Sequence, residues 1–173
     1  MNLVAALNLP VDVWRIERLV VYTDELRLMM PQARVPFDSE QWAEKLDPKT
    51  GILSYFVYSE DHRIGHFALR KIKDRPEVYL CYVYLSPLYR GQGFGDKMMA
   101  LAEEITTATL NVSTLLLNVR STNTSAINLY RRAGFKIVHQ EGDAVRMQKD
   151  LVPAALRLPS LEDSAVVGRE PEL

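Results

Sequence analysis

The sequence predicts an α/β (α+β) protein with a mixed central sheet of about seven strands and about four helices. Three strand-like segments, 52–58, 64–72 and 78–85, follow one another with short polar turns between them. This arrangement predicts an antiparallel meander. A glycine-rich turn, an amphipathic helix and a further apolar strand, 114–119, come next. Because a strand–helix–strand unit brings its two strands parallel, 78–85 and 114–119 should lie parallel in one sheet.

The segment before the meander should supply one strand and two helices. Residues 11–19 are interpreted as the first strand, although their apolar residues alternate imperfectly. Residues 23–30 begin with Thr23 and two acids, which is typical of a helix start. Residues 38–46 show the same kind of start, and Trp42 and Leu46 give that helix an apolar face.

The turn after residue 85 carries the chemistry of the chain. Glycines stand at every second position, 91, 93 and 95. Apolar residues then recur at spacings of four, three and four from Phe94 to Ile105, which indicates one helix face. Such a turn presents unpaired N–H groups and the positive end of the helix dipole, a site suited to a phosphate. Arg90 adds a fixed positive charge.

Two familiar phosphate motifs are disfavoured at this turn. No Gly-Lys-Ser/Thr follows, which argues against a nucleotide-hydrolysing P-loop, and the mid-chain position without a later acidic partner argues against a dinucleotide fingerprint. The plain alternative is a helix entry that happens to be rich in glycine.

The remaining elements follow from the same patterns. A polar loop, 121–125, leads into a helix, 126–133, which Gly134 should end. Strands 135–140 and 144–151 are expected to form a final hairpin. From residue 152 prolines and acids dominate. We therefore expect one domain over 1–151 and a C-terminal tail over 152–173, flexible or packed on the surface.

Composition limits the partners. The net charge of −1 disfavours nucleic-acid binding by phosphate neutralisation. One cysteine, Cys81, excludes an intrachain disulfide and suits a reducing compartment. No apolar run has the length of a membrane helix. We expect a cytoplasmic protein with neither a membrane partner nor metal ligands.

Two motifs together resemble one family. Arg90-x-x-Gly93-x-Gly95 resembles the Arg/Gln-x-x-Gly-x-Gly/Ala motif of the GCN5-related N-acetyltransferase (GNAT) superfamily. The segment 123–135, with Asn, then Ala, Leu-Tyr and Gly-Phe, resembles its second signature. The resemblance covers about 11–151. It implies the GNAT acyl-CoA N-acyltransferase fold, with splayed parallel strands 4 and 5. It also implies direct transfer of acetyl from acetyl-CoA to a primary amine of a protein, peptide or small molecule, with coenzyme A as product. Homodimers are common in this superfamily.

The resemblance also implies roles for particular residues. Pantetheine should pair with the backbone where strands 4 and 5 separate, and the pyrophosphate should rest on the glycine turn. Tyr130 should give a proton to the departing thiolate, and Asn123 should contact the cofactor. The alternatives are a core tyrosine and a plain helix cap. The full expected cofactor-binding set is Val83, Tyr84, Leu85, Arg90, Gly91, Gln92, Gly93, Phe94, Gly95, Asp96, Asn123 and Tyr130.

A general base is not evident. The positions where relatives carry an acid are matched by Tyr79, Cys81 and Asn118, none of which is a strong base. Glu77 or His66 could assist through water, and Cys81 is a weaker option as an acyl-carrying nucleophile. The missing acid motivates a second hypothesis, an acyl-CoA-binding regulatory module without turnover.

Overall fold

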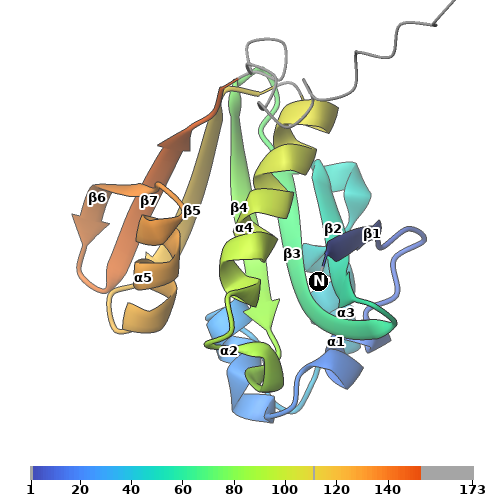
Figure 1. The fold of residues 1–173 in the computed structure, drawn as a ribbon. Coiled ribbons are helices and arrows are strands. Elements are labelled where there is room, and N and C mark those ends of the chain that lie inside the picture. Colours follow the sequence, from blue (N-terminus) through green and yellow to red (C-terminus); the bar gives the residue numbers. More distant parts are fainter. Residues whose placement is uncertain (1, 111, 153–173) are drawn as a thin grey trace, which may run out of the picture.

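The computed structural model describes residues 2–110 and 112–152. Within them one mixed sheet holds seven strands in the order β1-β2-β3-β4-β5-β7-β6 (Figure 1). The strands are β1 Leu3–Leu7, β2 Ile52–Ser59, β3 His62–Lys71, β4 Glu77–Leu85, β5 Thr114–Arg120, β6 Lys136–Glu141 and β7 Ala144–Asp150. The same residues form five α-helices, α1 Trp14–Leu19, α2 Leu26–Met29, α3 Ser39–Lys45, α4 Phe94–Ile105 and α5 Thr124–Arg132. The mixed sheet is confirmed, with one helix more than predicted.

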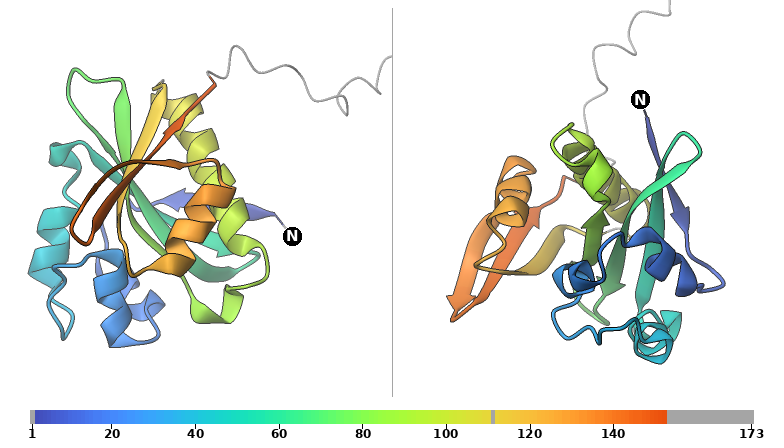
Figure 2. Two further views of the ribbon diagram at one scale, coloured as in Figure 1. Left: turned by 90° about the vertical axis from the view of Figure 1, so that its left-hand side faces the viewer. Right: turned by 90° about the horizontal axis from the view of Figure 1, so that it is seen from below.

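Helices cover both faces of the sheet (Figures 1 and 2). On one face α4 and α5 pack on the sheet around a core that includes Phe67, Met98 and Leu115. On the other face α1, α2 and α3 enclose a second core, in which Trp42 and Phe56 are almost fully buried. Because β2, β3 and β4 are buried on both faces, their sequences are nearly continuous apolar runs.

The predicted first strand is wrong. Residues 14–19 form α1, and the first strand is β1, which pairs antiparallel with β2 at the edge of the sheet. The buried residues of the segment, Val13, Ile16 and Leu19, are three apart, which is the spacing of a helix face. The imperfect alternation was therefore a helical period.

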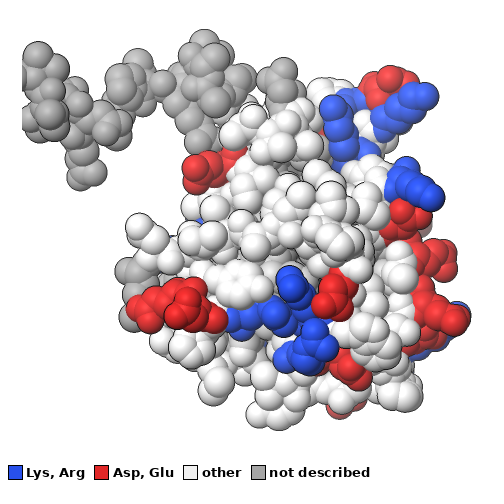
Figure 3. All heavy atoms as spheres, turned by 90° about the vertical axis from the view of Figure 1, so that its right-hand side faces the viewer, with Lys and Arg blue, Asp and Glu red and all other residues white. Residues whose placement is uncertain are grey.

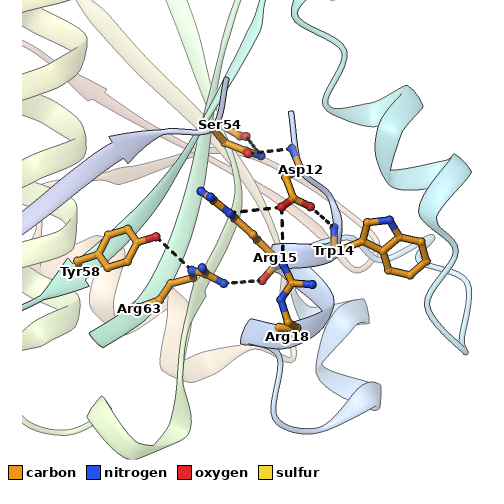
Figure 4. Close-up of polar contacts among 8 residues, drawn as sticks. Asp12, Trp14, Arg15, Arg18, Ser54, Tyr58 and Arg63 are labelled. Atoms are coloured by element: carbon orange, nitrogen blue, oxygen red, sulfur yellow. Dashed lines mark hydrogen bonds and ion pairs between the residues drawn. The ribbon is translucent and has the colours of Figure 1, made fainter. Parts of the chain in front are cut away.

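Polar contacts fix α1 on the sheet (Figure 4). Asp12, just before the helix, lies 3.4 Å from Nε of Arg15 and 3.6 Å from a terminal nitrogen of Arg18. Arg63 of β3 donates to the hydroxyl of Tyr58 on β2 and to the carbonyl of Arg15. These ion pairs are half-exposed, so each adds less than about 1 kcal/mol. Arg63 joins α1 to the sheet through the carbonyl of Arg15.

The surface shows no excess of either charge on the side drawn in Figure 3, where basic side chains lie beside acidic ones. In the part of the chain that the structure describes, no helix has the length and apolar character needed to span a bilayer.

One predicted helix end and most of the predicted tail lie outside the residues that the structure describes. α4 ends at Ile105 and continues as a π-helical turn, Thr106–Leu110, where Thr106 donates its hydroxyl to the carbonyl of Ala102 at 2.7 Å. The sequence also marks Asn111 as the end of this helix, and that residue lies outside the described residues. The tail predicted over 152–173 also lies outside them, apart from Val152.

Candidate active site

The central feature of the site is a wedge between β4 and β5. The two strands pair in parallel at three positions, from Glu77 opposite Thr114 to Tyr79 opposite Leu116. Beyond these, in the described chain, β5 pairs with β7 alone, while β4 continues to Leu85. The strands diverge visibly in Figure 1. This confirms the predicted splay, and it leaves the β4 edge free to pair with an extended ligand.

A β-bulge lies on β4 beside the open part of the wedge. His66 pairs with Tyr84 and Ala68 with Cys81, so Phe67 faces two residues of β4. One of those two is Tyr82, whose φ is 51°, a left-handed conformation that is uncommon outside glycine. Bulges of this kind redirect side chains and backbone groups, and they are frequent next to active sites.

The bulge changes which side chains face each layer of helices. Cys81 and Tyr82 are consecutive, yet both pack toward the core under α1–α3. Val83 and Leu85 pack toward the core under α4 and α5. Gly65 on β3 accommodates the altered backbone, because a Cβ there would lie 2.7 Å from the carbonyl oxygen of Tyr84.

His66 anchors the bulge from β3. Its side chain is fully buried, and its Nδ1 lies 2.8 Å from the carbonyl oxygen of Tyr82. Since a carbonyl only accepts, Nδ1 carries the proton, and Nε2 is left buried without a hydrogen-bond partner. Burial lowers the pKa of His66 to about 4. His66 is therefore neutral at physiological pH and holds β4 through this hydrogen bond, which is a structural role.

The glycine turn before α4 has the geometry that an anion site needs. Gly91 and Gly93 have φ values of 72° and 83°, and an added Cβ at either would meet no atom within 4 Å. Gly93 caps α4 without any side-chain hydrogen bond, and its carbonyl accepts from Lys97 at 3.3 Å. The amides of the first turn, Phe94 to Asp96, therefore lack intrahelical partners and coincide with the positive end of the dipole.

Gly95 and Asp96 also join α4 to α5. A Cβ at Gly95 would lie 3.1 Å from a methyl carbon of Leu129, so this glycine permits close helix packing. The Asp96 carboxylate accepts from Nε of Arg132 on α5 at 3.1 Å. Gln92 donates its side-chain amide to the carbonyl of Leu88 at 2.8 Å, which closes the turn on itself.

Arg90 connects the turn to the segment before α2. One terminal nitrogen lies 2.8 Å from the Glu25 carboxylate, and Nε donates to the carbonyl of Leu85 at 2.8 Å. The other Glu25 oxygen accepts from the hydroxyl of Tyr84 at 2.6 Å. Burial and this carboxylate raise the pKa of Tyr84 to about 12. Glu25 was missed from the sequence, where it was simply an acid in a helical first turn.

Tyr130 reaches the wedge from α5. Its side chain is 7% exposed, and its ring packs edge-on against Phe135. Burial raises the pKa of Tyr130 far above its usual value, and the Cys81 thiol raises it further. Cys81 belongs to β4, so Tyr130 of α5 lies close enough to this strand to be influenced by it. No hydrogen bond to the Tyr130 hydroxyl is recorded among the described residues, so its proton is available to a ligand.

Asn123 caps α5. Its side-chain oxygen accepts from the amide of Ala126 at 3.2 Å, which is the plain structural alternative recognised in the sequence. The predicted contact with the cofactor would have to come from the remaining side-chain nitrogen, and it stays a prediction.

The candidate bases are poorly placed for direct proton transfer. Glu77 lies where β4 and β5 are still paired, about 13 Å along the strand from Cys81. One of its carboxylate oxygens is buried without a hydrogen-bond partner. Burial raises the pKa of Cys81 to about 11, so at neutral pH it is a thiol rather than a nucleophilic thiolate. Asn118 instead accepts a hydrogen bond from Arg146.

An open strand edge, a helix N-terminus suited to phosphate and a protonated phenol between them define a class of protein. Such a site suits an extended ligand that carries a diphosphate. Residues 14–135 match the family model described as the Acetyltransferase (GNAT) family. The chain therefore belongs to this family of acetyltransferases, and acetyl-CoA is its acetyl donor.

Solved structures show the same fold. The chain is 20% identical to spermidine N-acetyltransferase from Vibrio cholerae in complex with CoA and spermine, with a TM-score of 0.69 over 86% of this chain and 95% of that one. It is 18% identical to Campylobacter jejuni N-acetyltransferase PseH in complex with acetyl coenzyme A, with a TM-score of 0.64 over 86% of this chain and 98% of that one. AAC(6')-Ib, solved with acetyl-CoA, is 16% identical to this chain, with a TM-score of 0.73 over 87% of this chain and 94% of that one.

Proposed function

We propose that this N-acetyltransferase acts on a primary amine by direct transfer, with the wedge between β4 and β5 as its active site. The observation that carries the proposal is the short parallel pairing, which ends at Tyr79 and Leu116. The edge of β4 at Val83, Tyr84 and Leu85, which β5 does not pair, then holds the pantetheine arm. The turn from Arg90 to Asp96 holds the diphosphate.

Acetyl-CoA supplies an activated thioester carbonyl. The amine nitrogen attacks this carbon, a C–N bond forms, and β4 amides beside the bulge stabilise the charge that develops on the oxygen. The C–S bond breaks and the thiolate receives a proton. Tyr130 donates that proton, because burial keeps its phenol protonated at neutral pH. Direct attack fits the structure, since Cys81 is a protonated thiol.

The proton lost by the amine goes to water in this mechanism. Beyond Tyr79 and Leu116, where the pairing of the two strands ends, residues 80–85 of β4 and 117–120 of β5 include no carboxylate. Glu77 is too distant for direct contact and assists only through a chain of water molecules. The rate should therefore rise with pH until the acceptor amine is neutral, with a midpoint that follows the pKa of the acceptor.

An amine acceptor agrees with a fold neighbour. The Vibrio cholerae structure contains CoA together with spermine, a polyamine, in a protein that shares this fold. The neighbour supports the reaction type, while the acceptor of the present chain depends on its own side chains.

The test is an assay of thiol release from acetyl-CoA with a panel of primary amines. We expect release that requires both the protein and an amine, with an N-acetylated product detected by mass spectrometry. Calorimetry with coenzyme A measures cofactor binding separately. Binding without release for any amine would favour the regulatory module instead.

A further inference from the structure

Two arginines approach, from opposite sides, the point where the pairing of β4 with β5 ends. Arg70 on β3 is in register with Tyr79, and one of its terminal nitrogens lies 3.2 Å from the hydroxyl of Tyr82. Arg146 comes from β7, and its Nε lies 3.2 Å from the side-chain oxygen of Asn118. Its guanidinium carbon is 5.9 Å from the ring centre of Tyr79. Arg146 thus extends across β5 to β4.

Both arginines lie on the face of the sheet that α1–α3 partly cover. Tyr82 packs toward the core under these helices. Leu115 and Leu117 pack toward the opposite core, so the alternation along β5 places Asn118 on the α1–α3 face. Arg146 is the register partner of Asn118 and shares that face. The donor-binding turn and α4 belong to the other side, which leaves this face to the acceptor.

Neither guanidinium has a compensating carboxylate. Among the described residues, ion pairs within 4.0 Å are recorded for Arg90 and Arg132, but none for Arg70 or Arg146. Their recorded partners are a phenol, an amide oxygen and an aromatic ring, which hold a guanidinium in place without cancelling its charge. Arg146 is also exposed, and both of its terminal nitrogens lack a recorded partner in the described chain.

Of the acids on the same face, Glu77 and Asp150 lie toward the paired end of the strands, and Glu25, which contacts Tyr84 near the open end of β4, is already paired with Arg90. Glu77 is opposite Thr114, and Thr114 in turn is opposite Asp150. Asp150 accepts a hydrogen bond from Gln148 at 3.1 Å. Arg70, opposite Tyr79, and Arg146, over the Tyr79 ring, thus place positive charge at the point where β4 and β5 separate.

We infer that the acceptor is a primary amine with a carboxylate a few bonds from its nitrogen, and that Arg70 and Arg146 bind this carboxylate. The inference rests on the proposed amine acetylation. A planar guanidinium matches a carboxylate in two parallel hydrogen bonds, so two such groups select the acid and orient its amine toward the thioester. A polyamine would instead bring positive charge against two uncompensated cations.

The test compares acceptors that share an amine and differ in charge. Each amino acid is assayed beside its own carboxamide, a peptide with an N-terminal Asp beside one with Asn, and spermidine is included. We expect the acid to exceed its amide by about tenfold or more in kcat/KM, the size of one hydrogen bond to a charged group. The amino-acid and peptide arms identify which source of the carboxylate is used.

Variants assign the preference to the two side chains. Arg70→Gln and Arg146→Gln should each lower the acid-to-amide ratio about tenfold, chiefly through KM of the acid. Arg146→Lys keeps the positive charge but loses the planar pair of donors, so its acid-to-amide ratio should lie between those of the parent and Arg146→Gln. Arg75→Gln, in the exposed turn before β4, is the control and should leave the ratio unchanged. Thermal unfolding of each variant separates a loss of fold from a loss of recognition.

Two results contradict the inference in different ways. Equal use of acid and amide, or a preference for spermidine that the arginine variants leave unaltered, would overturn the acceptor class while amine acetylation stands. Coenzyme A binding with no acetylation of any amine would overturn the proposed function and the inference with it.

Discussion

At the scale of single residues, His66 gives the stability of the fold a distinctive pH dependence. Its pKa is about 4 in the folded protein and about 6.5 when unfolded. Between these values only the unfolded state binds the proton, so stability is lost as the pH falls from about 6.5 to 4. The loss from this residue approaches roughly 3 kcal/mol.

The measurement is chemical unfolding between pH 7 and 4.5. His66→Asn retains an N–H donor near the carbonyl of Tyr82 but does not titrate, so its stability should decline less steeply than that of the parent. His62→Asn, at an exposed position of β3, should run parallel to the parent. Parallel profiles for all three proteins would show that His66 does not bind its proton on unfolding.

Tyr130 is the residue whose replacement should affect the chemical step alone. Tyr130→Phe removes the proton donor and keeps the ring against Phe135, so kcat should fall about 100-fold, within the usual range for a general acid. Coenzyme A affinity by calorimetry should change little. Tyr55→Phe is the matched control, because Tyr55 is equally buried and belongs to β2, which pairs with β1 and β3 and not with β4. An unaltered kcat for Tyr130→Phe would remove it from the mechanism.

Single residues were predictable where a local pattern marked them. The glycine turn and Tyr130 stand in short motifs, and their binding and catalytic roles stay predictions. The contacts of Arg90 with Glu25 and of His66 with Tyr82 were not predictable, because they join residues 65 and 16 positions apart. Asn123 was ambiguous for another reason, since a helix cap and a ligand contact require the same side chain.

At the scale of elements, the turn before α4 can be tested with two glycines of similar conformation. Gly93 and Gly142 both have positive φ and open space around an added Cβ. Alanine at either should therefore cost about 1 to 2 kcal/mol of stability through backbone strain. Gly93→Ala should also weaken coenzyme A binding several-fold, because it moves the amides of the first turn of α4.

Gly142→Ala, in the β6–β7 hairpin, is the control and should bind coenzyme A like the parent protein. Thermal unfolding and calorimetry on both variants give the comparison. If the two variants lose the same affinity, the effect comes from general destabilisation, and the turn does not hold the diphosphate.

Elements with a strong period were predicted well and the shorter ones were not. β2, β3 and β4 and the helix that follows them fall close to the expected ranges. The first segment failed because six residues of α1 show too few repeats to distinguish a helical from a strand pattern. β1 was missed because an edge strand with exposed Val4 and Leu7 lacks the alternation of a half-buried strand.

At the scale of the whole molecule, coenzyme A should protect one strand edge in a graded way. Amides of β4 from residue 80 to 85, beyond the pairing with β5, and those of the first turn of α4 should exchange more slowly with the cofactor bound. Residues 77–79 already face β5 and should change little. Hydrogen exchange with mass spectrometry, with and without coenzyme A, measures this. Uniform protection along β4 would contradict binding in the wedge.

The meander and the parallel unit were predictable from strand and helix patterns, but the splay came only from the resemblance to the family. Its physical origin is tertiary. Past Leu116, β5 pairs with β7 and no longer with β4, and β4 carries the bulge at Tyr82. The β5–β7 pairing and the bulge on β4 depend on neighbours distant in sequence, so no local sequence pattern predicts them.

The short pairing between β4 and β5 divides the sheet into two blades, β1–β4 and β5–β7, that share three register pairs along one seam. Beyond this seam the two blades are joined through the apolar core under α4 and α5, which contains residues of both. A donor that contacts both blades should reduce their motion relative to each other. Loading the enzyme should therefore stiffen β6 and β7 as well, although neither touches the thioester.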